Sequence, residues 1–575
     1  MGKKKYRATP QTKAGAVKTA GINENEVAKE TEKITESAAE KIQQETKKNA
    51  KGRNVSDGEV ITADRLRTRR NATAYERASQ VFACLMFAVF PMLIGQGKYT
   101  NITETKYYWF IGLTAAFLFM ILALAIAYIV LDKWYVERKA EGRQKLLPIQ
   151  IVILVYMVWA VISAIASGHG ICHDTIIGQS RFEALLSIWL YGITFVLISL
   201  WGEFTEKYSY AAAVMAIVFG FICFLQSCGS TMIYPEGYCY WDINFTGTIG
   251  NIDCVSGLIA TFLPMLAASF VIFENKWRWL MVPGVVLFTY IQSFIDVDSG
   301  KLGLIAAAVM TLPFIVDTKK KASRSALIYA VIAVSIGLEK WLNPTREGFQ
   351  PYFGKTAALL FIGAVVLAVI SVLLSKKDGE FSFEPAKIRK AAWIAIVVLV
   401  IIALLFIYFY NGTITLLQEA SAILHGQLND EAGTLRGYIY KATWQCIKTY
   451  GLIGAGPGCF YEAFYPYNAG YNVYAPNQVV DYAHCDLLQI ATCEGIIGLI
   501  IYLVFVGMLA YMALKNAGRC PVVVILAGGC VGFLIHSWFS FSIAIVSPPF
   551  WIMAGLLVKC IRQIPEKKQT AKQSK

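Results

Sequence analysis

Long uncharged runs recur along most of this chain, and many approach the length that crosses a bilayer as a helix. That length is about 20 apolar residues, and 56% of the 575 residues are apolar. Because the bilayer core offers no water to backbone N–H and C=O groups, helices are the form in which such runs span it. The pattern therefore predicts an all-α, polytopic membrane protein with about 12–14 transmembrane helices. Fourteen spans are expected at residues 79–96, 108–131, 149–167, 184–202, 209–227, 252–273, 279–295, 301–316, 326–340, 356–375, 391–410, 495–514, 520–541 and 547–562.

Lys and Arg side chains collect in alternate connections between these runs. The basic connections include "DKWYVERKAEGRQK", "DTKKKASRS" and "SKKDGEFSFEPAKIRK", and the C-terminal segment is basic as well. Cytoplasmic connections of membrane proteins carry an excess of Lys and Arg. The pattern therefore predicts that both termini are cytoplasmic.

The N-terminal segment differs from the rest in composition. Residues 1–77 contain 18 Lys or Arg and 11 Asp or Glu, with almost no apolar runs. Such a composition is typical of a disordered tail near anionic lipid, and a nucleic-acid-binding arm is the alternative. The expected organisation is a basic cytoplasmic tail at 1–77, a helix bundle at 78–410, an extracytoplasmic loop at 411–494, C-terminal helices at 495–562 and a basic tail at 563–575.

The predicted loop at 411–494 is long for a compact membrane protein, and such loops are commonly functional. Within it, residues 429–451 are expected to form a helix that ends at Gly451. Arg436, Tyr440 and Trp444 share one face of that helix because they are spaced four residues apart. A cation with aromatics on one face also suits a helix that merely lies at the bilayer interface.

Four sequence pieces occur in an order that is similar to a known family. They are "GQSRFEALLSIWLYG", "TGTIGNIDCVSGLIATFLPM", "TLRGYIYKATWQCIKTYGLIGAGPGCF" and "AHCDLLQIATCEGIIGLIIY". Together they resemble the O-antigen ligase and O-antigen polymerase family of membrane glycosyltransferases, over roughly residues 150–560. The chain departs from the family pattern at Cys485, where an Asn is usual, and at Gly300, where an Arg is usual and Lys301 follows. It also has more predicted spans than the dozen or so that are typical of the family.

The resemblance implies a GT-C-like glycosyltransferase of the bacterial cytoplasmic (inner) membrane, working in cell-envelope polysaccharide biosynthesis. It would transfer a glycan from an isoprenoid carrier such as undecaprenyl diphosphate to an acceptor hydroxyl on the outer face. The implied partners are this donor, a glycan, lipid or cell-envelope acceptor, and membrane lipids, without nucleic acid or a cofactor. Ligase, polymerase and protein O-glycosylation activities stay open. A transporter or flippase of lipid-linked sugars is the alternative, although no internal repeat and few charges within the spans are evident.

The candidate site follows from the chemistry that this transfer requires. His484 is the expected base for the acceptor hydroxyl, and Arg436 is expected to bind the diphosphate and stabilise its leaving charge. Direct attack predicts inversion at the anomeric carbon, and no metal-ligand pattern is present, so metal-independent transfer is expected. The expected substrate-binding residues are Arg181, Lys301, Lys441, Asn251, Asp486 and Glu494.

Each assignment has a structural alternative. His484 could be a structural interfacial residue, and one of the carboxylates could be the real base. Arg436 could extend towards lipid headgroups, and Arg181 could be a positional anchor. Asn251 could cap its helix. His536 lies in an apolar run and is expected to be a hydrogen-bonded interior residue without a role in the reaction.

Overall fold

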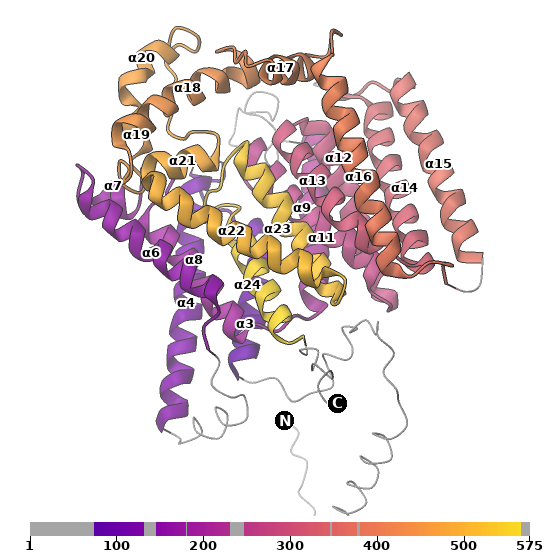
Figure 1. The fold of residues 1–575 in the computed structure, drawn as a ribbon, viewed down its shortest axis with the longest axis horizontal. Coiled ribbons are helices and arrows are strands. Elements are labelled where there is room, and N and C mark those ends of the chain that lie inside the picture. Colours follow the sequence, from indigo (N-terminus) through magenta and orange to yellow (C-terminus); the bar gives the residue numbers. More distant parts are fainter. Residues whose placement is uncertain are drawn as a thin grey trace, which may run out of the picture. The chain divides into compact units, whose positions relative to one another are not determined.

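Helices dominate the computed structural model, which describes residues 74–99, 101–130, 145–179, 181–230, 247–345, 348–376 and 380–564 (Figure 1). The two predicted tails lie almost entirely outside these residues, as does the basic connection at 131–144. The elements before residue 300 are α3 (Ala74–Cys84), η1 (Leu85–Val89), η2 (Phe90–Met92), α4 (Ile102–Val130), α6 (Pro148–Ala166), α7 (His173–Ile176), α8 (Leu185–Trp201), α9 (Lys207–Ser227), α11 (Ile252–Ile272), η3 (Lys276–Leu280), α12 (Met281–Ile295) and α13 (Asp298–Ile315). The later ones are α14 (Lys319–Leu342), β1 (Pro344–Thr345), β2 (Gly348–Phe349), α15 (Lys355–Lys376), α16 (Pro385–Tyr408), α17 (Thr415–Leu424), α18 (Ala432–Tyr450), α19 (Phe460–Phe464), η4 (Tyr465–Tyr467), α20 (Asn468–Tyr471), α21 (Asp486–Cys493), α22 (Gly495–Ala517), α23 (Pro521–Trp538) and α24 (Pro548–Arg562).

The all-α membrane architecture predicted from the apolar runs is confirmed. Each of the fourteen expected segments corresponds to helical structure, and eleven of the described helices are long and apolar enough to cross a membrane. The others are α8, which is apolar but shorter, α24, and the α3–η1–η2 segment that ends at Met92. The strands β1 and β2 form only a small antiparallel hairpin between α14 and α15.

Helices α11 and α23 form the centre of the bundle. In their most apolar 18-residue windows, 83% of α11 and 78% of α23 residues are buried, whereas none of the α16 window is buried. Glycines bring the central helices into close contact: a Cβ atom on Gly532 of α23 would lie 1.9 Å from the Ala260 carbonyl oxygen of α11. Such small residues allow the backbones of packed membrane helices to approach closely. Figure 1 shows α17–α20 along one end of this bundle.

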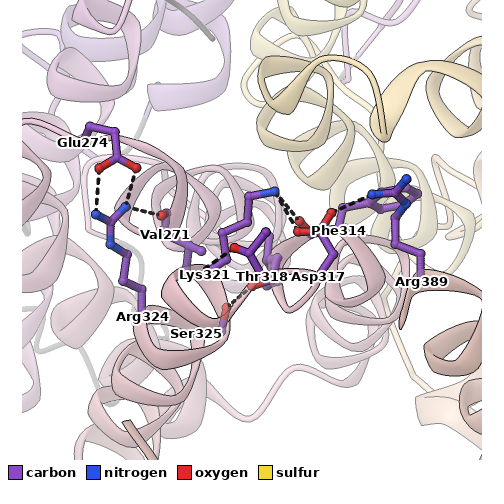
Figure 2. Close-up of polar contacts among 10 residues, drawn as sticks. Val271, Glu274, Phe314, Asp317, Thr318, Lys321, Arg324, Ser325 and Arg389 are labelled. Carbon is purple, nitrogen blue, oxygen red and sulfur yellow. Dashed lines mark hydrogen bonds and ion pairs between the residues drawn. The ribbon is translucent and has the colours of Figure 1, made fainter. Parts of the chain in front are cut away.

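The opposite end of the bundle carries a network of ion pairs (Figure 2). Arg324 pairs with Glu274 at 3.0 Å and donates to the Val271 carbonyl oxygen at 2.9 Å. Asp317, whose side chain is 5% exposed, pairs with Lys321 at 2.8 Å and with Arg389 at 2.7 Å. Because Arg389 belongs to α16, the Asp317 carboxylate ties this otherwise exposed helix to the α13–α14 connection.

Candidate functional site

Arg436 of helix α18 lies next to the first turn of α11, which carries Asp253. Gly433, Thr434 and Leu435 have left-handed backbone angles (φ 61°, 59° and 67°), so regular helix begins at Arg436. The Arg436 Nη2 atom lies 3.7 Å from Asp253 Oδ1. The expected helix at 429–451 therefore begins later than predicted, at Arg436, and the carboxylate partner of this arginine was not predicted.

His484 occupies the turn that leads into α21. Its backbone is in the left-handed region (φ 52°), which is uncommon for a residue with a Cβ atom. Tyr440 Oη donates a hydrogen bond to the His484 carbonyl oxygen at 3.1 Å, and the imidazole packs against Phe541. The buried Nδ1 atom has no hydrogen-bond partner among the described residues. The imidazole is therefore held in place while one ring nitrogen stays available.

The charge of the His484 imidazole is set by its surroundings. Burial, followed by the nearby Arg436 and Arg181 guanidinium groups, lowers the pKa of His484 to about 3, and Asp481 only partly offsets this. The imidazole is therefore neutral near pH 7. A neutral imidazole has a lone pair that can accept a proton.

Arg181 reaches the same place from the segment before α8. Its Nε atom donates to both carboxylate oxygens of Asp481 at 3.0 Å. The guanidinium also lies over the Phe541 ring, 4.9 Å from its centroid. The structure thus brings together three of the predicted residues, His484, Arg436 and Arg181, from separate parts of the sequence.

Asp486 and Glu494 face the protein interior. Asp486 is buried and accepts hydrogen bonds from Tyr482 at 3.2 Å, Tyr502 at 3.2 Å and Ser542 at 2.7 Å. Burial raises the pKa of Asp486 to about 6, and burial also raises the pKa of Glu494. Both carboxyl groups, together with Glu183, line a small cavity of about 50 Å³. Because Asp486 and Glu494 face the interior, this arrangement favours a role in stabilising the fold around His484 over direct contact with an acceptor.

Asn251 caps α11. Its side-chain Oδ1 accepts hydrogen bonds from the backbone N–H groups of Asp253 at 2.8 Å and Cys254 at 3.2 Å. These contacts match the structural alternative, since Asn at this position satisfies otherwise unpaired N–H groups. The cap also fixes the turn that presents Asp253 to Arg436.

Both predicted lysines are paired with carboxylates. Lys301 lies 2.6 Å from Asp296 and 2.8 Å from Asp298, and Lys441 lies 2.7 Å from Asp430. Within the described part of the chain, neither lysine forms an ion pair or hydrogen bond with the residues around His484.

The structure explains the glycine beside Lys301. A Cβ atom on Gly300 would lie 1.8 Å from Ser256 Oγ of α11. A side chain there requires the Ser256 hydroxyl or the helices themselves to move, so the observed packing disfavours an arginine at this position.

An apolar cavity of about 490 Å³ lies between α11, α12, α13 and α14. Its α13 wall runs from Lys301 to Ile315, almost the length of that helix. The lining is mainly aliphatic, and Asp296, Lys301 and Lys340 bring charge to it. An elongated apolar cavity with polar groups at one end suits a hydrocarbon chain.

Several residues of the site were missed at the sequence level. Asp253 and Asp481 anchor the two arginines, Phe541 packs against His484, and Ser542 binds Asp486. Asp481 stands three residues before His484, just ahead of the motif that begins at Ala483, so its nearness in sequence is a signal for this partner. Phe541 and Ser542 follow α23 and carry no local pattern that marks them.

Comparison with known families gives one result. Residues 352–503 match the family model described as "O-Antigen ligase". This range contains Arg436, Lys441, His484, Asp486 and Glu494, while Arg181, Asn251 and Lys301 lie outside it. Comparisons with curated proteins and with solved structures give no match.

Proposed function

We propose that this membrane protein, whose residues 352–503 match the O-antigen ligase family model, transfers a glycan from an isoprenoid-diphosphate carrier to an acceptor hydroxyl. The observation that carries this proposal is a neutral, partly unpartnered imidazole next to two guanidinium groups. The imidazole of His484 interacts electrostatically with the guanidinium groups of both Arg436 and Arg181. A leaving diphosphate needs cations, and an attacking hydroxyl needs a base.

The two arginines would bind the diphosphate. A guanidinium keeps its charge and presents paired donors that match phosphate oxygens. Asp481 holds the Arg181 guanidinium in a defined orientation before the donor arrives, and Asp253 lies near the Arg436 guanidinium without a hydrogen bond to it. At 3.7 Å the Arg436–Asp253 contact is long, so Arg436 can turn towards a more highly charged ligand at little cost.

His484 would accept the acceptor's proton. The acceptor oxygen attacks the anomeric carbon, the bond from that carbon to the diphosphate oxygen breaks, and the electron pair leaves with the diphosphate. The hydroxyl proton moves to the imidazole, and the attack inverts the anomeric carbon. Bound diphosphate would also offset the positive charge of Arg436 and Arg181, which raises the pKa of His484. Donor binding would thereby strengthen the base.

The membrane setting supports a lipid-linked donor. The apolar cavity between α11, α12, α13 and α14 has room for part of an isoprenoid chain. The Lys and Arg pattern of the sequence supports an orientation with cytoplasmic termini, which places residues 411–494 on the outer face of a bacterial cytoplasmic membrane. The acceptor would then be a glycan, lipid or cell-envelope component exposed there.

A transfer assay tests this function. The purified protein in lipid is given a lipid-diphosphate oligosaccharide and separate glycan, lipid and peptide acceptors, and the wild type is compared with His484→Ala and Arg436→Ala. Lys448→Ala is the matched control, because Lys448 lies on α18 beside Trp444 rather than Asp253. Transfer by wild type and control but not by the two site variants is expected. Equal transfer by all four proteins refutes the site, and movement of the intact donor across the bilayer without transfer identifies a flippase instead.

A further inference from the structure

His536 is a fully buried imidazole in the last turn of α23. Neither Nδ1 nor Nε2 has a hydrogen-bond partner within the part of the chain that the structure describes. The expectation of a hydrogen-bonded interior histidine is therefore wrong. A neutral imidazole has one donor and one acceptor, and leaving both unmade in a buried place costs free energy. Such groups in native structures call for a reason beyond packing.

The helix opposite His536 makes room for this side chain. A Cβ atom on Gly257 of α11 would lie 2.7 Å from His536 Nε2, so only glycine leaves space for the ring. Gly257 stands four residues after Asp253, which places both on the same face of α11. The imidazole is thus one helical turn below the carboxylate that pairs with Arg436.

Residues 540–542, which follow His536 after the end of α23, contact residues of the candidate site. Ser540 Oγ is also buried without a hydrogen-bond partner among the described residues. Phe541 contacts His484 and Arg181, and Ser542 donates to Asp486. The Arg436 guanidinium interacts electrostatically with His536 as it does with His484. Unpartnered buried polar atoms at His484, His536 and Ser540 therefore adjoin one site.

We propose that His536 is a positioning residue of the transfer site. When donor occupies the site, the imidazole hydrogen-bonds with the Asp253 carboxylate one helical turn away, and so holds the Asp253–Arg436 pair in the orientation that binds the diphosphate. The inference rests on the proposed function, because the pair it positions is the proposed diphosphate site.

Substitution by a side chain of similar volume separates this role from plain packing. His536→Leu removes two unmet hydrogen-bonding groups, so the variant should melt at the same or a higher temperature than wild type. A residue that only packs would leave transfer unchanged. A positioning residue would lower kcat/KM for the donor by about 10-fold or more, since small displacements of binding groups have effects of that size. His536→Gln, which keeps a donor and an acceptor, should recover part of the loss.

The experiment measures melting temperature, kcat and donor KM for wild type, His536→Leu and His536→Gln. Thr114→Val is the matched control: Thr114 Oγ1 of α4 is likewise buried without a partner among the described residues. The control should keep full transfer. Wild-type kinetics in a folded His536→Leu variant would overturn the inference. If that variant fails to fold, His536→Met, which also lacks a nitrogen donor and acceptor, takes its place, and wild-type kinetics in folded His536→Met would overturn the inference.

A second readout separates this inference from the proposed function. Inorganic pyrophosphate is titrated into each protein and the melting temperature is followed. If wild type binds pyrophosphate and transfers no glycan, the proposed function fails. Weaker pyrophosphate binding by His536→Leu than by Thr114→Val then still supports the positioning role, and equal binding refutes it.

Discussion

The ring centroids of His484 and Phe541 are 4.7 Å apart, and the Arg181 guanidinium lies over the same aromatic ring, 4.9 Å from its centroid. One side chain from the turn after α23 thus contacts both the proposed base and one of the proposed diphosphate-binding cations. Phe541, which is uncharged and takes no part in proton transfer, therefore helps to set the distance between His484 and Arg181. Phe541 is 2% exposed, so the position of its ring is set by dense packing.

Replacing Phe541 with Leu should lower transfer by about 10-fold or more, because His484 and Arg181 lose their common support. The matched control is Phe82→Leu: Phe82 of α3 is equally buried but stacks on Phe117 of α4. Both variants should lose similar stability, about 1 kcal/mol. Kinetics and melting temperatures check this, and an equal loss of transfer in both would show that general destabilisation is the cause.

His484 should make stability depend on pH in a defined window. Its pKa is lowered from 6.5 to about 3, so between these values the unfolded chain binds a proton that the folded chain does not. The free energy of unfolding is therefore highest, as far as His484 is concerned, above pH 6.5, and it decreases as the pH falls towards 3. In His484→Gln the fall in melting temperature between pH 6.5 and 4.5 should be smaller than in wild type. Identical pH profiles would contradict the buried, neutral imidazole.

His484→Gln should also reduce transfer by about 10²–10⁴-fold, the range for loss of a general base. The matched control is His425→Gln, since His425 stacks on Tyr408 of α16 and lies outside the site. Single-turnover transfer with saturating donor measures the chemical step. A variant that keeps more than a third of wild-type turnover would exclude His484 as the base.

Arg436→Lys and Arg181→Lys should both weaken donor binding although the charge is kept. An ammonium group cannot reproduce the paired donors of a guanidinium, and hydrogen bonds to charged groups contribute about 1.5–3 kcal/mol. The expected loss is about 10- to 100-fold in kcat/KM. Lys301→Gln is the informative comparison: Lys301 is already paired with Asp296 and Asp298, so its removal should have a much smaller effect. A larger effect of Lys301→Gln would move the diphosphate site to α13.

Gly300→Ala should destabilise the bundle by about 1–3 kcal/mol, because the new Cβ atom would lie 1.8 Å from Ser256 Oγ. Gly112→Ala is the control, since a Cβ atom there meets nothing within 4 Å. Melting temperatures in detergent give the comparison. Ser256→Ala should partly restore the Gly300→Ala variant, and the absence of any restoration would mean that the contact with α11 is not what requires glycine.

Asp317→Asn should loosen α16, because it leaves Lys321 and Arg389 together without their carboxylate. A loss of about 2 kcal/mol is expected for this largely buried group. The exposed Lys320–Glu274 pair provides the control, and Lys320→Gln should cost less than about 1 kcal/mol. Protease sensitivity of the connection before α16 and the melting temperature report the outcome, and equal losses would argue against a special role of Asp317.

The local parts of the site could be predicted from short-range patterns. The end of the α18 helix at Gly451 and the cap at Asn251 each depend on backbone chemistry within a few residues, whereas the expected helix start at residue 429 is wrong because Gly433, Thr434 and Leu435 are left-handed and regular helix begins at Arg436. The Lys301–Asp298 pair is also local, because the two residues are three positions apart on α13. The pairing of Lys441 could not be predicted in the same way, since its partner Asp430 lies eleven positions away and approaches only once the loop is folded.

The sequence by itself determined the membrane helices, because the bilayer requires about 20 apolar residues and internally paired backbone at every crossing. It also determined which stretches carry Arg436 and His484. Only the tertiary structure decided that Arg436 meets Asp253, that Arg181 meets Asp481 across 300 positions, and that His536 is buried without a partner among the described residues. The physical reason is that these contacts depend on how closely whole helices approach. Glycines such as Gly257, Gly300 and Gly532 set that approach, and no local pattern states which helix each glycine will face.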